Sequence, residues 1–254
     1  MKLPLLNKNE CIIPICYAYD MGYFNKHNFD IDLHFHDGIW TDHDLFVNGD
    51  IPCIRGDYSR YLIFKDLGLD PELTHTFSRD FQILTRLDFN DLSEINGEKI
   101  LLSIGTSVEF YLEMFLQEHG LELEKIHEKE IETRYDRFLA GEADIVMIPE
   151  PYASKLLAQG YKVLHDIRTT DINVKVYMWD KKFLSENPDV PQKLMDIIDE
   201  ATIAFNNLDE EAQYTYLLKY DMVDSRDEFF KKQFELNLPV TQKSLDAAAK
   251  WYNV

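Results

Sequence analysis

The sequence has no run of about 18 apolar residues, and this absence excludes a membrane-spanning helix. The apolar start at residues 3–6 resembles a signal peptide, but the polar residues 7–10 interrupt it at once, so we do not interpret it as one. We therefore expect either that an export signal was removed, which would place the protein outside the membrane, or that Met1 is the native start and the protein is cytoplasmic.

Cysteine and basic residues are also scarce. The chain has three cysteines, Cys11, Cys16 and Cys53, an odd number with no Cys-x-x-Cys pair. This argues against a disulfide framework and against a cysteine zinc site, and it favours a reducing compartment. The 26 basic residues face 46 acidic ones, a net charge of -20 that disfavours binding to nucleic acid and to anionic membrane surfaces.

Familiar catalytic motifs are missing as well: we find no nucleophile elbow, no phosphate-binding P-loop and no His-Glu-x-x-His helix. His34 and His36 form a His-x-His pair that is able to ligate zinc, but exposed histidines on a solvated strand face are the simpler interpretation. Cys11 is either a reactive thiol in a loop or an inert packed one. We expect no metal, no cofactor and no catalytic residues.

Strand and helix patterns alternate along the chain. Residues 29–36 alternate apolar and polar side chains, which predicts a half-buried strand with Phe29, Ile31, Leu33 and Phe35 on its inner face. The alternation restarts near residue 97, as if a second α/β unit begins there. We predict strands at 3–6, 29–36, 51–55, 99–104, 125–131, 143–148 and 174–179.

The helices predicted within this alternation cover residues 14–21, 41–49, 59–68, 108–118, 134–140 and 152–159. Beyond residue 179 the pattern is mainly helical. Further helices are predicted at residues 190–207, 210–220, 225–235 and 242–252.

Three stretches resemble a known family. Residues 21–31 (MGYFNKHNFDI), residues 141–151 (GEADIVMIPEP) and residues 183–188 (FLSENP) resemble signatures of the type II periplasmic solute-binding proteins, in the branch of the sulfonate, taurine and thiamine-precursor binders. The order and spacing fit across nearly the whole chain. Pro52 departs from the pattern, because an acidic residue usually stands there.

The resemblance implies a two-lobed α/β fold with two crossing hinge strands, near residues 81–87 and 174–179, and a helical C-terminus. Lobe one would hold residues 1–82 and 180–254, and lobe two residues 83–179. It also implies binding of a small organic solute, anionic or heterocyclic, in an interlobe cleft that closes by hinge motion, for uptake with an ABC transporter permease or for sensing, without chemistry.

A cytoplasmic enzyme on the same fold is the alternative. The thiamine-pyrimidine synthase of fungal type resembles these binders, but it needs a cysteine-rich iron motif that this chain lacks.

The candidate ligand-binding residues follow from the rule that α/β proteins bind ligands beyond the carboxyl ends of their strands. Gly105, Thr106 and Ser107 precede a helix and suit an anion, although a helix cap would also explain them. Glu150 either accepts hydrogen bonds from a cationic ligand, pairs with a neighbouring base or braces the hinge. The aromatic candidates, which would stack on a flat ligand or pack within a lobe, are Trp40, Tyr58 and Tyr152. The remaining candidates are His36, Thr41 and Ser59.

Overall fold

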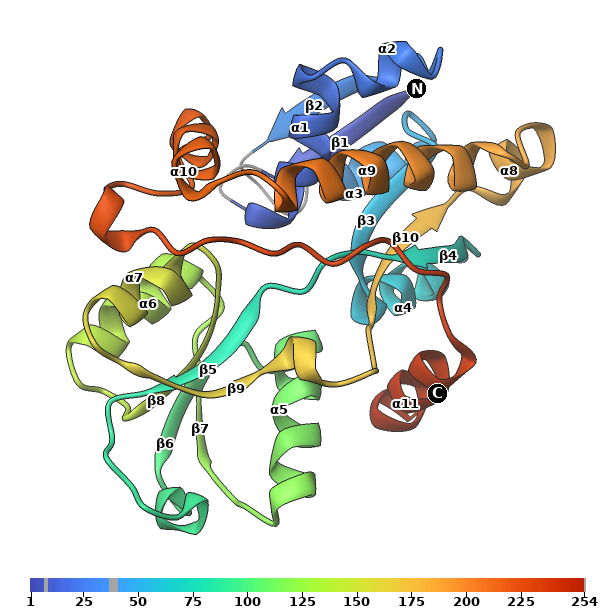
Figure 1. Cartoon of the computed structure of the whole chain (residues 1–254). Helices are drawn as coiled ribbons and strands as arrows, with labels where there is room; N and C mark the ends of the chain where they lie inside the picture. The colour runs from blue at the N-terminus through green and yellow to red at the C-terminus, as the bar shows by residue number, and fades with distance from the viewer. Residues whose placement is uncertain (7–8, 37–40, 254) are drawn as a thin grey trace. The chain divides into compact units, whose positions relative to one another are not determined.

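The computed structural model describes residues 1–6, 9–36 and 41–253 (Figure 1). The chain divides into two compact units. Unit 1 comprises Met1–Arg79, Ile172–Met222 and Lys231–Val254, and unit 2 comprises Asp80–Asp171 and Val223–Phe230.

Unit 1 begins as the alternation predicts. Its first part contains β1 (Lys2–Leu6), η1 (Glu10–Ile12), α1 (Ile13–Asp20), α2 (Tyr23–Lys26), β2 (Asp32–His36), α3 (Thr41–Val47), β3 (Cys53–Asp57), α4 (Tyr58–Asp66) and β4 (Glu72–Thr76). After the excursion through unit 2 it continues with β10 (Lys175–Trp179), α8 (Lys181–Glu186), α9 (Val190–Asn206), α10 (Glu210–Lys219) and α11 (Gln242–Tyr252).

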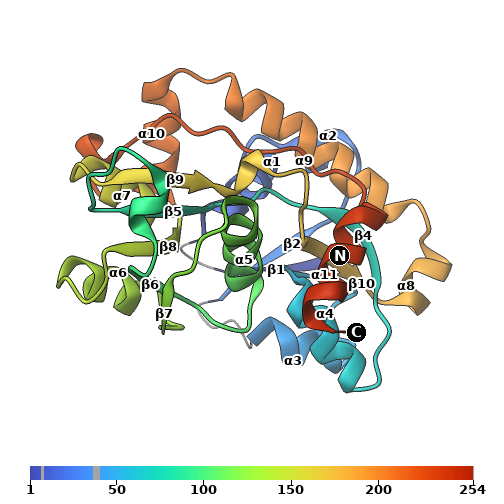
Figure 2. The ribbon, with the colours of Figure 1, turned by 90° about the horizontal axis from the view of Figure 1, so that it is seen from below.

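The strands of unit 1 form two small sheets. β1 and β2 pair in parallel, and β10 lies between β3 and β4 and is antiparallel to both. One face of the three-stranded sheet packs an apolar cluster that includes Ile54, Phe64 and Met178. On the other side, α1 packs along α9, the long helix that Figure 2 shows from below.

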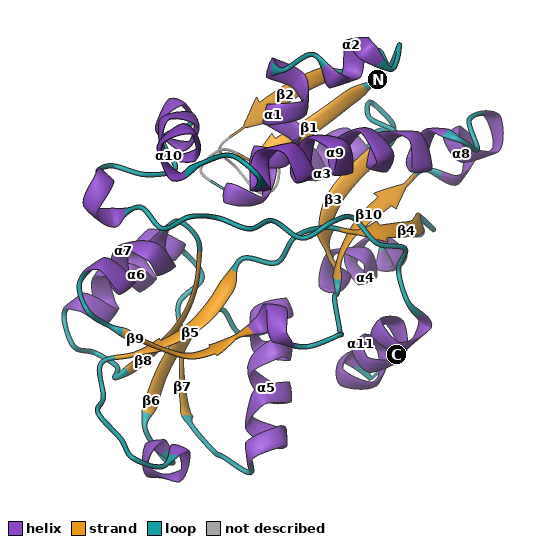
Figure 3. Ribbon diagram, viewed as in Figure 1, coloured by secondary structure: helices purple, strands orange, loops and turns teal. Residues whose placement is uncertain are grey.

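Unit 2 contains β5 (Phe81–Thr85), η2 (Leu92–Ile95), β6 (Lys99–Leu102), α5 (Ser107–His119), β7 (Glu124–His127), α6 (Ile131–Leu139), β8 (Ile145–Pro149), α7 (Tyr152–Ala158), β9 (Lys162–Asp166), η3 (Ile167–Thr169) and η4 (Arg226–Glu228). Its sheet has the order β7-β6-β8-β5-β9, in which β7, β6 and β8 run parallel and β5 is antiparallel to β8 and β9. Helices α6 and α7 cover one face and α5 the other (Figure 3). Every residue of β8 is buried, as expected for a central strand with helices on both faces.

Two predictions at this level are wrong. Residues 225–235 were predicted as a helix, but only Arg226–Glu228 form a single 3₁₀ turn, and residues 229–235 have no regular secondary structure. The inner face predicted for residues 29–36 holds at Phe29 and Ile31 and fails at the end of β2, where Phe35 is 41% exposed and His36 only 7% exposed. His36 is therefore not the exposed histidine that the sequence suggested. Its Nε2 lies 3.8 Å from Asp42 Oδ2, a separation beyond hydrogen-bond distance.

The two strands predicted as hinge crossings each belong to one sheet. β5 lies wholly in the five-stranded sheet and β10 wholly in the three-stranded sheet. The chain passes from one unit to the other after Arg79, Asp171, Met222 and Phe230. Across the described ranges, every helix is too short or too polar to span a bilayer.

Candidate ligand-binding edges

In unit 2, the parallel strands bring two predicted loops to the same edge of the sheet. β6 and β8 are neighbours in register, with Ile100 opposite Ile145 and Leu101 opposite Val146. Their carboxyl ends therefore lie side by side, and the residues that follow them, 103–107 and 150–152, share that edge. We call this set the unit 2 edge. It contains five of the ten predicted site residues.

Gly105, Thr106 and Ser107 form the turn that starts α5. Gly105 has φ +80°, a left-handed conformation that favours glycine, and it is exposed. Thr106 is the N-cap: its Oγ1 accepts a hydrogen bond from the Val108 N–H at 3.3 Å and donates to the Ser103 carbonyl at 2.9 Å. Ser107 is 3% exposed. The capping interpretation is confirmed for Thr106, and contact with a ligand stays a prediction for all three.

A carboxylate of the chain itself already binds this turn. The Gly105 N–H donates to Glu109 Oε2 at 2.8 Å, and Lys125 Nζ lies 2.6 Å from Glu109 Oε1. A backbone N–H at a helix start is a favourable place for negative charge. The turn is thus able to hold an anion, and a ligand carboxylate or sulfonate would have to displace Glu109 from it.

Glu150 and Tyr152 lie at the end of β8 and the start of α7. Glu150 Oε2 accepts from the Ser154 N–H at 2.9 Å, so its carboxylate binds an orphan donor in the first turn of α7, where negative charge is favoured. The Tyr152 hydroxyl donates to Glu132 Oε1 at 2.9 Å, and its ring lies 5.4 Å from that of Tyr135. Burial raises the pKa of Tyr152, and the hydrogen bond to Glu132 raises it further. The hydroxyl therefore stays protonated and remains a donor near neutral pH.

Two residues at this edge were not predicted. Arg134 is 1% exposed and donates to the carbonyls of Glu128, Met147 and Lys129, which ties the loop after β7 to β8. Gln82 is 7% exposed, and its Oε1 has no hydrogen-bond partner among the described residues. Neither residue belongs to a motif that would have marked it in the sequence.

In unit 1, the predicted residue Ser59 belongs to a polar network, and His36 lies beside it. Asp42 follows Thr41 on α3, and its carboxylate lies near His36. It accepts hydrogen bonds from Nη1 and Nη2 of Arg60, at 3.1 and 2.8 Å. The Arg60 N–H in turn donates to Asp57 Oδ1, which also accepts from the Ser59 hydroxyl. Ser59 is thus linked to Asp42 through Asp57 and Arg60. His36 lies beside Asp42, and Thr41 is exposed.

Tyr58 does not join this network, and Trp40 lies outside the described residues. The Tyr58 ring packs on Tyr61 and Tyr252, at 5.3 and 6.0 Å between centroids, and it is 8% exposed. Among the described residues, no group of three or more His, Cys, Asp and Glu side chains is arranged to hold a metal ion.

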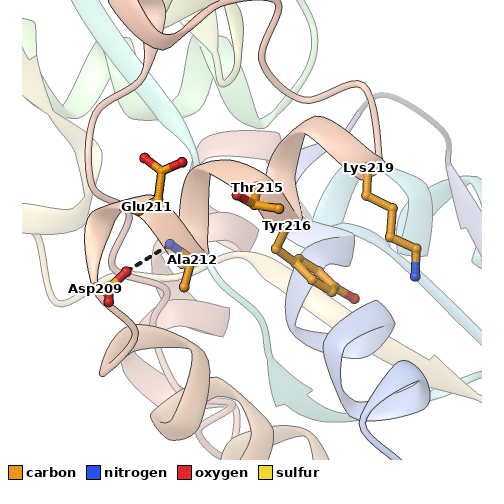
Figure 4. Close-up of a pocket in the computed structure, with 6 residues that line it drawn as sticks. All are labelled: Asp209, Glu211, Ala212, Thr215, Tyr216 and Lys219. Carbon is orange, nitrogen blue, oxygen red and sulfur yellow. Dashed lines mark hydrogen bonds between the residues drawn. The ribbon is translucent and has the colours of Figure 1, made fainter.

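A separate hollow of about 580 Å³ lies along α10 in unit 1 (Figure 4). It is lined by Asp209, Glu211, Ala212, Thr215, Tyr216 and Lys219. None of these is a predicted site residue. Two of the lining side chains are already hydrogen-bonded within the chain, because the Tyr216 hydroxyl and Lys219 Nζ both donate to Asp20 Oδ2.

Comparison with known proteins shows the fold. No protein-family model matches the sequence, and no curated protein matches it. Among solved structures, the periplasmic aliphatic sulphonate-binding protein SsuA from Escherichia coli is 18% identical with a TM-score of 0.78, over 99% of this chain and 87% of its own. The alkanesulfonate-binding protein SsuA from Xanthomonas axonopodis pv. citri, bound to MOPS, is 14% identical with a TM-score of 0.73, over 99% and 91%.

The periplasmic nitrate-binding protein NrtA from Synechocystis PCC 6803 is 13% identical with a TM-score of 0.66, over 96% of this chain and 74% of its own. These neighbours agree with the resemblance seen in the sequence. They confirm the predicted fold class, the α/β fold of type II periplasmic binding proteins with a helical C-terminus.

Proposed function

We propose that this chain, which has the fold of the type II periplasmic solute-binding proteins, binds a small organic solute at the carboxyl ends of its strands and delivers it to an ABC importer. The observation that carries the proposal is the likeness to sulfonate- and nitrate-binding components over 96–99% of the chain. A fold by itself does not fix a function, so the chemistry of the edge has to support the proposal.

The unit 2 edge favours an anionic or heterocyclic ligand. The Gly105 N–H already binds a carboxylate, and its position at the start of α5 adds the positive end of a helix dipole. The half-buried ring of Tyr152 offers a flat face nearby, and Glu150 offers an acceptor. A ligand with an acidic head and a flat or amine-bearing body matches these three groups.

The test is a binding screen on the purified chain. We expect thermal stabilisation by at least one member of a panel of alkanesulfonates, small carboxylates and aminopyrimidines, with an affinity then measured by calorimetry. A ligand present at 100 times its Kd stabilises the folded state by about 2.7 kcal/mol. The compound should be recovered unchanged; its consumption would favour the enzyme alternative, and a panel without any binder would contradict the proposed ligand class.

A matched pair of variants tests the position of the site. Glu150→Gln removes the acceptor charge at the unit 2 edge, whereas Glu124→Gln makes the same charge change at the amino end of β7, at the opposite edge of the same sheet. For an amine-bearing ligand we expect a loss of tenfold or more in affinity with Glu150→Gln, equivalent to about 1.4 kcal/mol. Equal affinities for both variants would remove Glu150 from the site.

A further inference from the structure

Cys11 and Lys175 place a sulfur and a nitrogen nucleophile in contact inside unit 1. Lys175 Nζ lies 3.2 Å from Cys11 Sγ, and Cys11 Sγ donates to the Ser78 carbonyl at 3.1 Å. The two residues are 164 positions apart in sequence and are 4% and 7% exposed. Cys11 belongs to η1, and Lys175 is the first residue of β10.

The backbone on both sides of this contact is pinned. The Cys11 N–H donates to Asn9 Oδ1 at 2.9 Å, and Arg55 Nη2 donates to the Cys11 carbonyl at 2.9 Å. The Lys175 N–H donates to Asn173 Oδ1 at 3.0 Å, and its ammonium lies 5.0 Å from the centre of the Phe77 ring. Sγ and Nζ therefore stay close together in the folded chain, which raises their effective concentration toward each other.

The other two cysteines provide internal controls. Both are buried, and none of the three cysteines is part of a disulfide. Burial raises the pKa of Cys16 to about 12, and it raises the pKa of Cys53 well above its ordinary value. The Cys16 side chain is hydrogen-bonded to Tyr220, a phenol that offers no amine. Among the described residues, neither of these two thiols is hydrogen-bonded to a lysine amine, so neither should form an S–N link.

We propose that Cys11 and Lys175 form a covalent cross-link when the protein meets a peroxide. The thiol first loses two electrons to hydrogen peroxide, giving a sulfenic acid and one water. The lysine amine, after its ammonium releases one proton to solvent, then attacks the sulfur. An S–N bond forms, the S–O bond breaks, and the hydroxyl leaves with the second amine proton as water.

This proposal is independent of the proposed solute-binding function. The cross-link joins η1, which follows β1, to β10, and it removes conformational freedom from the unfolded chain across a long loop. We therefore expect the oxidised protein to melt at a higher temperature than the reduced protein. Hydrogen peroxide is small enough to reach the buried sulfur through local opening.

The experiment is mass spectrometry of the intact, full-length chain before and after treatment with hydrogen peroxide, followed by peptide mapping. The S–N bridge makes the chain about 2 Da lighter, and a thiol reductant should reverse it. We expect one linked pair of peptides, containing Cys11 and Lys175. Oxidation of Cys11 without a link, a link to another lysine, or no change would overturn the proposal.

Variants and an unfolded control sharpen this result. Cys11→Ser and Lys175→Arg should abolish the cross-link, whereas Cys16→Ser and Cys53→Ser should leave it in place. The wild-type chain treated with peroxide in urea tests the geometry even if a variant fails to fold. A cross-link that forms as readily in urea would show that the folded contact is not its cause.

Discussion

Arg134 offers a sharp test of how the unit 2 edge is held together. Its guanidinium donates to three backbone carbonyls, at 3.1, 2.8 and 3.3 Å, and its side chain is buried. Hydrogen bonds from a charged donor contribute about 2 kcal/mol each. Burial lowers the pKa of Arg134 to about 10, which corresponds to a cost of about 3 kcal/mol for carrying the charge there. The bonds outweigh that cost, so Arg134→Met should destabilise the protein by about 3 kcal/mol.

Arg137, one turn further along α6, is the matched control. It forms ion pairs with Glu128 and Glu142 at the surface, where such pairs contribute about 0–1 kcal/mol, so Arg137→Met should have little effect.

The assay is urea unfolding of both variants and the wild type, followed by far-UV circular dichroism. The midpoint should fall by about 1–2 M urea for Arg134→Met, given a typical denaturant slope. Tryptophan fluorescence provides a second readout that reports unit 1, because Trp179 and Trp251, the tryptophans among the described residues, belong to that unit. Equal midpoints for the two variants would refute the reasoning, because the buried bonds would then contribute no more than the exposed pairs.

Three further predictions concern single positions. Gly105→Ala should destabilise the protein by about 1 kcal/mol in urea unfolding, because φ +80° is unfavourable for a residue with a Cβ atom. Burial raises the pKa of Asp20, but hydrogen bonds, the largest of them from Lys219, outweigh it and the pKa is lowered. The stabilisation from Asp20 is present above the pKa of the unfolded chain, about 3.9, and is lost as the pH falls through the pKa of the folded chain. The Asp20→Asn variant should therefore lose less stability than the wild type on acidification from about pH 5 to about pH 2. Gln213→Ala should cost about 2–4 kcal/mol in the same assay, because the fully buried amide bonds both the N–H and the carbonyl of Lys232.

Local patterns predicted the elements that carry the unit 2 edge. The apolar run of β6, the turn with its glycine, and the amphipathic helix α5 that Thr106 caps all use interactions between residues close in sequence. The same holds for β8 and α7. These signals suffice to place Gly105, Thr106 and Glu150 at the ends of neighbouring strands, because a parallel βαβ arrangement brings those ends together.

Long-range contacts decide where the prediction failed. Residues 231–238 form no helix, and side chains from distant helices bond their backbone. The Asn206 amide accepts from the Phe234 N–H and donates to the Phe234 carbonyl, and Asp199 accepts from the Asn237 N–H. Such partners override helix propensity, and they are invisible to a local pattern. The contact between Lys175 and Cys11 was not predicted for the same reason.

The contacts within the unit 2 edge also bear on what a ligand must do there. Glu109 binds the Gly105 N–H and Glu150 binds the Ser154 N–H, so the chain's own carboxylates occupy donors at the starts of α5 and α7. An incoming anion gains only the difference between its own bonds and those that it replaces. Once displaced, Glu109 would still contact Lys125. Burial lowers the pKa of Lys125, but the carboxylates of Glu109 and Glu113 outweigh it and the pKa is raised. Under the proposed function, Glu109→Gln should therefore bind an anionic ligand more tightly than the wild type, because the neutral amide competes less well for the Gly105 N–H.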